Sequence, residues 1–170
     1  GSGQVPKCYD YFQEVMNILS THLAKAGIAI VLLGVKEDPI LQGTYDLRGK
    51  TSLHQSNYLV KRALLHIGND SWMAHAAGNL SIPLVALYGS TDKVIHGPHW
   101  QGKVKLLESH RKGNKPSFSN ESPKTVNLID PFDVARAVLD LPWRGRWGLP
   151  GDRGGAGRPS RGGRGRARGG

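Results

Sequence analysis

Residues 64–79 read Leu-Leu-His-Ile-Gly-Asn-Asp-Ser-Trp-Met-Ala-His-Ala-Ala-Gly-Asn. The apolar run at 64–68 predicts a short β-strand, and the small residues at 73–79 predict a tight helix. Between them, Asn-Asp-Ser at 69–71 is a helix-start signal, because these side chains accept hydrogen bonds from free backbone N–H groups. A strand that leads through a polar turn directly into a helix is typical of a parallel α/β sheet.

The rest of the chain continues this alternation of helices and strands. Helical periodicity covers residues 9–26, and Gly27 is the expected stop. The run Ile28–Leu33 is continuously apolar, which is typical of a strand that is covered on both faces. Further elements are expected as a short weak strand at 45–49, a helix from about 52 to 63, strands at 82–88 and 104–107, and a helix at 131–141. We therefore expect an α/β domain over residues 1–141, with a Rossmann-like parallel sheet and helices on both faces.

The helix that begins near residue 52 has a clear start signal. Thr51 or Ser52 can cap it, and Gln55 stands about one turn later, as in a capping box. The apolar positions Leu53, Val60 and Ala63 are expected to form its inner face.

The net charge is +10, from 23 Lys and Arg against 13 Asp and Glu, which suggests a nucleic-acid partner. Residues 141–170 hold eight Arg and one Asp, so they contribute +7 and leave +3 for residues 1–140. From residue 142 onward the chain is rich in Gly, Arg and Pro and has little to bury, so we expect a disordered tail over 142–170. The charge therefore belongs mostly to the tail.

Several classes of protein are excluded by composition. A single cysteine, Cys8, rules out an intrachain disulfide framework and a Cys-based zinc site. No apolar run approaches the roughly 18 residues of a membrane span, and the first residues lack the apolar core of a signal peptide. We expect a soluble, cytoplasmic protein, with peripheral contact at the inner membrane face as an option. We expect Lys7 beside Cys8 to lower the pKa of the thiol. The alternative is that this cysteine has no specific role.

The polar residues at 69–75 form the densest candidate site. They follow a strand and open a helix at the carboxyl end of the sheet, where open α/β sheets bind ligands. Free N–H groups and the positive end of the helix dipole favour a phosphate there. Ser71 and His75 are four residues apart and share a helix face, so a hydroxyl and an imidazole can meet one anion. The alternative is that Asp70 is only a helix cap and His75 a structural histidine.

An ordered set of motifs around this cluster resembles the carboxyl-terminal half of the heptosyltransferases, glycosyltransferase family 9. The matching stretches are Asp46–Leu53, Ile67–Ser71, His75–Ala77, Pro83–Asp92 and Gly97–Pro98. Residues 1–7 are similar to the family's glycine-rich turn and its following lysine. The family has the two-domain GT-B fold, and the resemblance covers roughly residues 1–140, which implies one Rossmann-like half of that fold.

The resemblance implies that this half binds a nucleotide-sugar donor, typically ADP-heptose, in lipopolysaccharide biosynthesis. Asp70, Ser71 and His75 match the family's Asp, Thr and His along the diphosphate and sugar, Lys7 matches a lysine at the phosphates, and Glu37 matches an acidic residue near the ribose. The full set of implied donor-binding positions is Lys7, Glu37, Asp70, Ser71, Trp72, Met73 and His75. A helix N-terminus with Lys and His stabilises the leaving diphosphate, so neither a metal nor a cofactor is implied.

Two departures from the family pattern affect what the chain is expected to do. Trp72 stands where the family usually has Gly, and its indole either crowds a phosphate or offers a stacking face, whereas glycine lets backbone N–H groups approach closely. The amino-terminal half, which in the family binds the acceptor and supplies the general base, has no match in these 170 residues, and the domain's first strand is expected to be missing before Gly1. No catalytic residue is therefore identified, and the expected partner is such a half or a second copy.

Two other functions stay open. In the first, the domain is a non-catalytic nucleotide-sugar-binding module, an alternative that Trp72 and the missing half favour. Alternatively the protein binds RNA through the tail, where residues 161–166 resemble RGG-type sequence. Nucleic acid is the weaker option, because translation of a GC-rich or shifted frame gives the same composition. An anionic membrane partner or no specific role are the other possibilities for the tail.

Overall fold

The computed structural model describes residues 7–98, 103–109 and 124–142. Their elements, in chain order, are α1 (Phe12–Lys25), β1 (Val31–Leu32), β2 (Tyr45–Asp46), α2 (Leu53–Arg62), β3 (His66–Asn69), α3 (Trp72–Asn79), β4 (Leu84–Tyr88), α4 (Lys93–His96), β5 (Val104–Glu108), the 3-10 helix η2 (Thr125–Leu128) and α5 (Pro131–Asp140). The strands form two parallel groups, β1–β2 and β3–β4–β5. The sequence did not predict the short helices α4 and η2.

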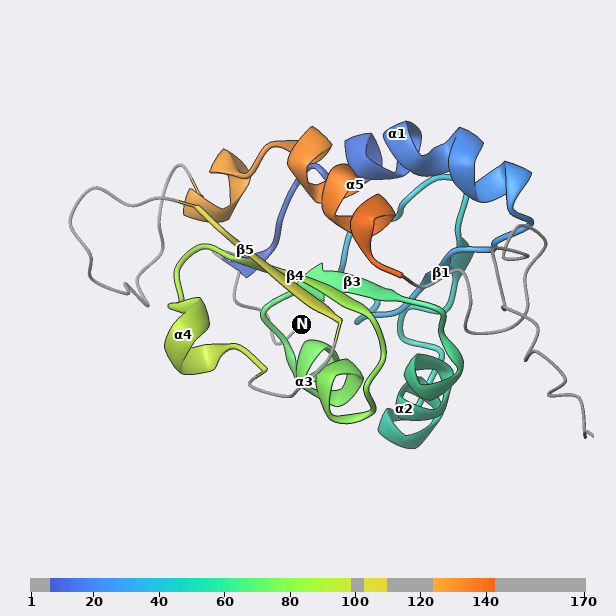
Figure 1. The fold of residues 1–170 in the computed structure, drawn as a ribbon. Coiled ribbons are helices and arrows are strands. Elements are labelled where there is room, and N and C mark those ends of the chain that lie inside the picture. The colour runs from blue at the N-terminus through green and yellow to red at the C-terminus, as the bar shows by residue number, and fades with distance from the viewer. Residues whose placement is uncertain (1–6, 99–102, 110–123, 143–170) are drawn as a thin grey trace, which may run out of the picture.

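Helices cover both faces of the sheet, as predicted (Figure 1). The central strand β4 is buried throughout, and its side chains alternate between two apolar clusters. Val85 and Leu87 pack with residues of α1 and α5, whereas Leu84, Ala86 and Tyr88 pack with residues of α2 and α3. This layering confirms the Rossmann-like α/β class.

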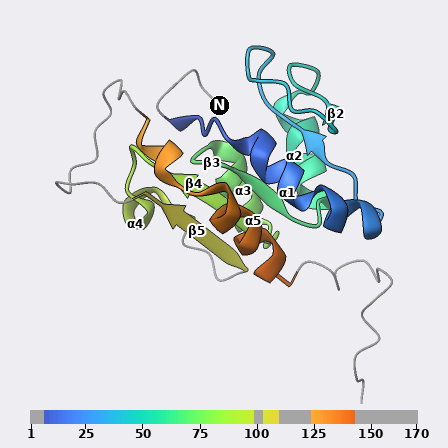
Figure 2. The same ribbon diagram turned by 90° about the horizontal axis from the view of Figure 1, so that it is seen from above.

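The helices α1 and α5 lie side by side on one face, although they come from opposite ends of the described chain (Figures 1 and 2). Val15 and Leu19 of α1 and Val134 and Val138 of α5 belong to one buried cluster. A proline at the first position of α5, preceded by Asp130 as its N-cap, fixes where that helix starts. The pairing joins the first helix of the domain to the last.

The predicted cap of α2 is confirmed, but the prediction that Leu53 lies on the inner face of this helix is wrong. The Ser52 hydroxyl accepts from the Gln55 N–H, and the Gln55 side chain accepts from the Ser52 N–H, which completes a capping box. Val60 is buried as expected, whereas Leu53 is 63% exposed. Leu53 is the first residue of α2, two turns before Val60, and it is Val60 that packs into the buried cluster with α3.

The run at 28–33 is not the doubly covered strand that its composition predicted. Only Val31 and Leu32 pair as strand residues, and none of the six residues is fully buried. Val31 is 45% exposed. The reason is that β1 pairs with β2 on one edge only, while a cavity that β3 also lines separates β1 from the other strand group. The apolar pattern correctly indicated a strand, but the burial of its side chains depends on neighbouring segments, and the described residues cover β1 only in part.

Two sequence predictions fall on residues outside the described ranges. These are the disordered tail, apart from Pro142, and the glycine-rich turn expected ahead of Lys7. Within the described part of the chain, no helix combines the length and apolarity needed to cross a bilayer.

Candidate functional site

The site forms at the carboxyl edge of the sheet, around Asp70. Asp70 directly follows β3, and its N–H donates to the Leu87 carbonyl of β4 at 3.1 Å, which extends the ladder by one residue. Its side chain is only 7% exposed. The Lys7 ammonium donates to Asp70 Oδ2 at 2.8 Å, and the Thr91 hydroxyl donates to the same oxygen at 2.8 Å. One carboxylate therefore joins the chain before α1, the end of β3 and the turn after β4.

This arrangement excludes the reading of Asp70 as only a helix cap. The N-cap of α3 is Ser71, and its hydroxyl makes no capping hydrogen bond. The first hydrogen bond of this helix runs from the Ala74 N–H to the Ser71 carbonyl, so the N–H groups of Trp72 and Met73 precede the helical ladder. The amino end of α3 thus has free donors beside the Lys7 ammonium, which is a favourable setting for an anion.

The other predicted residues on α3 lie around the same point. His75 Nε2 is 3.9 Å from Asp70 Oδ1, and the imidazole is 47% exposed. Trp72 is 40% exposed, whereas Met73 is 9% exposed and packs inward. The indole is therefore available at the surface beside the free N–H groups.

Glu37 is the one predicted residue that the structure does not bring to this cluster. It lies in the exposed turn after β1. The neighbouring residue Asp38 lines the cavity described below, and the Asp38 carboxylate accepts from the Val35 N–H at 2.9 Å. A role for Glu37 near a ribose stays a prediction.

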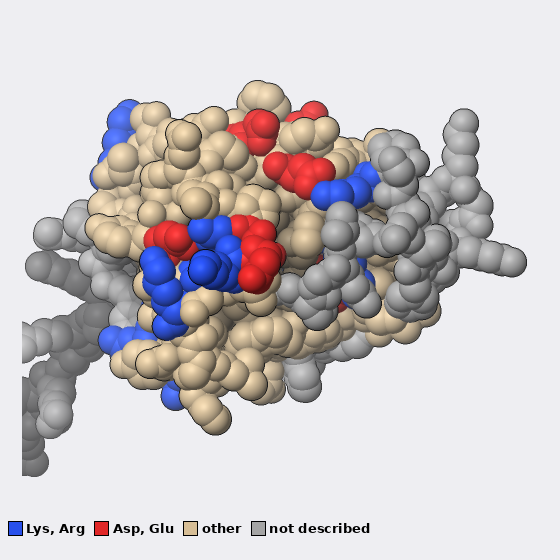
Figure 3. All heavy atoms as spheres, turned by 180° about the vertical axis from the view of Figure 1, so that it is seen from behind, with Lys and Arg blue, Asp and Glu red and all other residues tan. Residues whose placement is uncertain are grey.

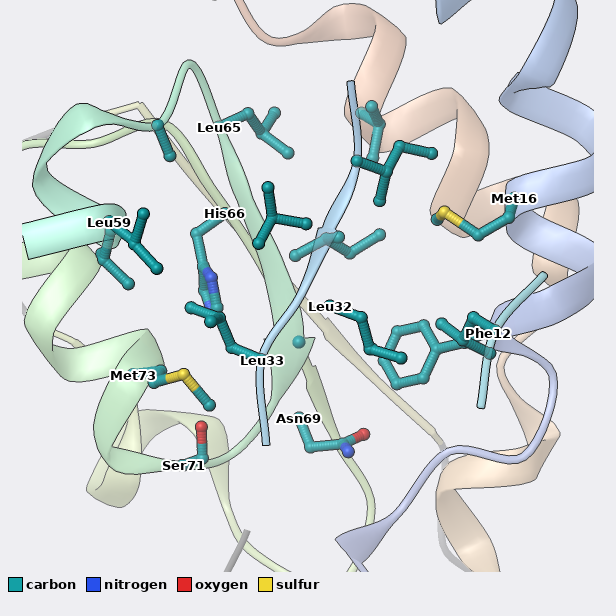
Figure 4. Close-up of a pocket in the computed structure, with 18 of the residues that line it drawn as sticks. Phe12, Met16, Leu32, Leu33, Leu59, Leu65, His66, Asn69, Ser71 and Met73 are labelled. Atoms are coloured by element: carbon teal, nitrogen blue, oxygen red, sulfur yellow. The ribbon is translucent and has the colours of Figure 1, made fainter. Parts of the chain in front are cut away.

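A cavity of about 890 Å³ leads from this edge into the body of the domain (Figure 4). At its polar end it is lined by Lys7, Asp70, Ser71, Trp72 and Met73. Deeper in, aliphatic and aromatic side chains from α1, β1, α2 and β3 line it. Five of the seven predicted positions therefore border one cavity.

Cys8 shows the opposite of one sequence expectation. Burial raises the pKa of the thiol, and the nearby carboxylate of Asp38 adds to this, outweighing the effect of Lys124. The thiol is thus less reactive than an unperturbed cysteine, not more.

Two residues of interest were not found from the sequence. Thr91 belongs to the turn after β4. Because β4 pairs with β3 in the sheet, this turn lies next to the end of β3, and the Thr91 hydroxyl reaches Asp70. A signal existed, because turns at the carboxyl ends of neighbouring parallel strands meet at one edge. His66 lines the cavity with a buried Nε2 that has no hydrogen-bond partner in the described structure. Burial lowers the pKa of this imidazole to about 4.

Comparisons with known proteins all point to one family of glycosyltransferases. The family model for glycosyltransferase family 9 (heptosyltransferase) matches residues 2–126. Lipopolysaccharide heptosyltransferase 3 of Escherichia coli K12 is 28% identical over 96 residues, which is 56% of this chain and 28% of the relative.

Solved structures show the same fold. A glycosyl transferase family 9 structure from Veillonella parvula matches with a TM-score of 0.62 and 22% identity, and the E. coli ADP-heptose heptosyltransferase II matches with 0.61 and 22%. Each match covers 82% of this chain and 43% of the other chain. The chain thus spans less than half the length of these relatives. Because the family model covers most of the sequence, the protein belongs to glycosyltransferase family 9, the heptosyltransferases.

Proposed function

We propose that this domain binds the nucleotide-sugar donor, an ADP-heptose-like molecule, of a heptosyltransferase reaction. The observation that supports this most is the cluster of Lys7, Asp70 and Thr91 beside the free N–H groups of α3. It offers a fixed ammonium and a helix N-terminus at the mouth of a cavity. These are the groups that a diphosphate needs.

Each residue has a distinct part in the proposed binding. An ammonium carries three N–H donors, and Asp70 accepts from one, so Lys7 keeps donors for phosphate oxygens. Asp70, which also accepts from the Thr91 hydroxyl, holds Lys7 in place beside the donor phosphates. Ser71 and the N–H groups of Trp72 and Met73 face the diphosphate from the helix end, and His75 approaches from the same helix face.

The chemistry that this site serves is the departure of the diphosphate. As the bond between the anomeric carbon and the diphosphate oxygen breaks, negative charge accumulates on that oxygen. Lys7, the α3 dipole and His75 stabilise this charge, and the scheme requires neither a metal nor a cofactor. The acceptor site and general base are expected in an amino-terminal half, which is the proposed partner. The proposed setting is the cytoplasm, with contact at the inner membrane face.

Calorimetry with ADP and ADP-sugars tests the proposal. We expect Lys7→Met to weaken ADP binding at least tenfold, because it removes a charge-assisted contact of about 1.5–3 kcal/mol. Lys25→Met, on the exposed end of α1, is the matched control and is expected to leave affinity unchanged. His75→Ala should weaken ADP-sugar binding less than Lys7→Met does. Absence of any sugar-nucleotide binding below millimolar concentration would refute the proposal.

A second candidate, a non-catalytic binding module, is favoured by Trp72 at the phosphate end of α3. Mixing the domain with a separately expressed amino-terminal half separates the two candidates. Restored sugar transfer eliminates the second candidate, whereas donor binding without transfer supports it.

A further inference from the structure

The segment between Lys7 and α1 is held from two sides. On one side is the end of β3, where the Lys7 ammonium donates to Asp70 and the Tyr9 N–H donates to Asn69 Oδ1 at 3.1 Å. On the other side is η2, which lies beside this segment although it comes from near the far end of the described chain (Figures 1 and 2). The contacts with β3 form part of the candidate site, whereas the contacts with η2 lie outside it.

Two side chains of the η2 turn reach the segment together. Lys124 and Asn127 are three residues apart in a 3-10 turn, where such residues share a face. The Asn127 amide exchanges two hydrogen bonds with Asp10, since its Oδ1 accepts from the Asp10 N–H at 3.0 Å and its Nδ2 donates to Oδ2 at 2.7 Å. The Lys124 ammonium donates to Asp10 Oδ1 at 2.5 Å and to the Cys8 carbonyl at 3.4 Å. Residues 8 and 10 are therefore both attached to η2.

Tyr9, between these two residues, is fixed as well. Its side chain is buried in the apolar cluster of α1 and α5, and its hydroxyl donates to the Ile129 carbonyl at 2.7 Å. A buried ring with polar contacts on either side of it in the chain leaves the backbone little freedom. Because Lys7 is only two residues ahead of Tyr9, these contacts limit where the Lys7 side chain can reach.

The Asp10 carboxylate is directed to η2 rather than to the helix that follows it. Asp10 stands one residue ahead of Tyr11, the N-cap of α1, where a carboxylate commonly stabilises a helix start. Its two oxygens instead accept from Lys124 and Asn127. Burial alone would raise the pKa of Asp10, but these two hydrogen bonds outweigh burial and lower the pKa. The carboxylate therefore stays charged to lower pH than an unperturbed aspartate.

We propose that Lys124 and Asn127 are positioning residues for Lys7. They hold residues 8–10 against η2, and this keeps the Lys7 ammonium on Asp70 at the polar end of the cavity. Holding a charged group in place before a ligand arrives lowers the cost of ordering it on binding. That the ammonium then contacts a phosphate rests on the proposed donor-binding function, whereas the hold of η2 on Lys7 does not.

The reciprocal pair of Asp10 and Asn127 allows an exchange test. Asn127→Asp keeps an acceptor for the Asp10 N–H but places a second carboxylate against that of Asp10, so the side-chain contact becomes repulsive. Adding Asp10→Asn returns one amide and one carboxylate to the pair, with their places exchanged. Asn17→Asp, on the exposed side of α1, makes the same substitution away from the segment and is the matched control.

The first readout needs no ligand. It is the rate at which an amine-acylating reagent labels Lys7 in the full chain, followed by mass spectrometry, with Lys25 at the exposed end of α1 as the internal reference. We expect Asn127→Asp to speed the labelling of Lys7 about threefold, in keeping with the modest free energy of a partly exposed ion pair. The exchanged pair should restore the parental rate, and Asn17→Asp should leave it unchanged. An unchanged Lys7 rate in Asn127→Asp would overturn the proposal.

The second readout is the calorimetric affinity for ADP, with and without Lys7. We expect Asn127→Asp to weaken ADP binding about threefold in the parent and to add nothing in Lys7→Met, because a positioning residue acts only through the group that it positions. An equal loss in both backgrounds would assign Asn127 to the fold alone and contradict its positioning role. A chain in which the labelling of Lys7 changes as expected but which binds no ADP would refute the donor-binding proposal and uphold the hold of η2 on Lys7.

Discussion

His66 makes the stability of the domain depend on pH in a defined direction. Its folded-state pKa is about 4 because burial disfavours the imidazolium, whereas an unfolded histidine has a pKa of about 6.5. Between these values the unfolded chain binds a proton that the native chain excludes. The contribution of His66 to stability is therefore intact above pH 6.5 and falls as the pH drops towards 4, by up to about 1.4 kcal/mol per pH unit.

Urea unfolding at a series of pH values measures this dependence. The variant His66→Leu removes the titrating group and is expected to flatten the curve between pH 4 and 6.5. His54→Leu, on the exposed first turn of α2, is the control and should leave the slope as it is. Identical slopes for the parent and His66→Leu would show that the imidazole is not held neutral.

Trp72 offers a second test at a single position. It is the first residue of α3, and its partly exposed side chain lines the cavity at the end where phosphate is proposed to bind. We expect Trp72→Gly to strengthen ADP binding severalfold, because the backbone can then approach the phosphate closely. The measurement is calorimetry with ADP and with free adenosine. Weaker binding of both ligands would instead indicate that the indole stacks on the base.

At these positions, sequence reasoning could group residues only where a motif was contiguous. Asp70, Ser71 and Met73 lie in one helix-opening stretch, and the structure brings Lys7 to them. Thr91 was missed because its contact with Asp70 depends on which strands are neighbours, and local spacing does not contain this information. The orphaned nitrogen of His66 also depends on packing from distant segments.

The capping box of α2 gives a prediction for a single helix. Ser52→Ala removes the hydroxyl that accepts from the Gln55 N–H, and we expect a loss of about 1 kcal/mol in the free energy of unfolding. Because Val60 of α2 packs in the same cluster as Ala74 and Ala77 of α3, the loss should appear in global unfolding. Ser20→Ala is the matched control, since the Ser20 hydroxyl donates to the Asn17 carbonyl within the exposed side of α1 and caps no helix. Equal effects of the two changes would contradict a capping role.

Helices were easier to predict here than strands. The helices α1, α2 and α5 have apolar periodicity, and α3 has a start signal followed by small residues. These are local properties, and the structure places all four helices within a few residues of expectation. The run at 28–33 looked like an internal strand, yet its exposed Val31 shows that coverage comes from the rest of the sheet. An apolar run indicates that a strand can be buried on both faces, but whether its side chains are buried depends on the segments that pack against it.

For the molecule as a whole, the charge divides into two parts. On the face shown in Figure 3, basic and acidic side chains of the described residues lie close together rather than forming one basic area. Ion pairs such as Lys124–Asp10 and Lys93–Glu108 account for some of this balance. The excess of basic residues is in the tail.

Removing residues 143–170 tests whether the tail is needed for the stability and the ADP binding of the domain. The cut keeps Pro142, whose carbonyl accepts from the Lys103 ammonium at 3.1 Å. We expect the thermal midpoint and ADP affinity to stay unchanged, while any salt-dependent affinity for RNA disappears. Calorimetry and a salt titration of RNA binding check the two halves of this statement. RNA affinity that survives the truncation would assign it to the folded domain.

The pairing of α1 with α5 also has a consequence for how the protein is made. The apolar face of α1, with Val15, Met16 and Leu19, is completed by a helix that begins at Pro131. A ribosome adds about 5–20 residues per second, so on the order of ten seconds separate the synthesis of the two helices. During that interval the apolar face of α1 lacks the cover that α5 provides, and transiently exposed apolar surface of this kind favours aggregation of a nascent chain.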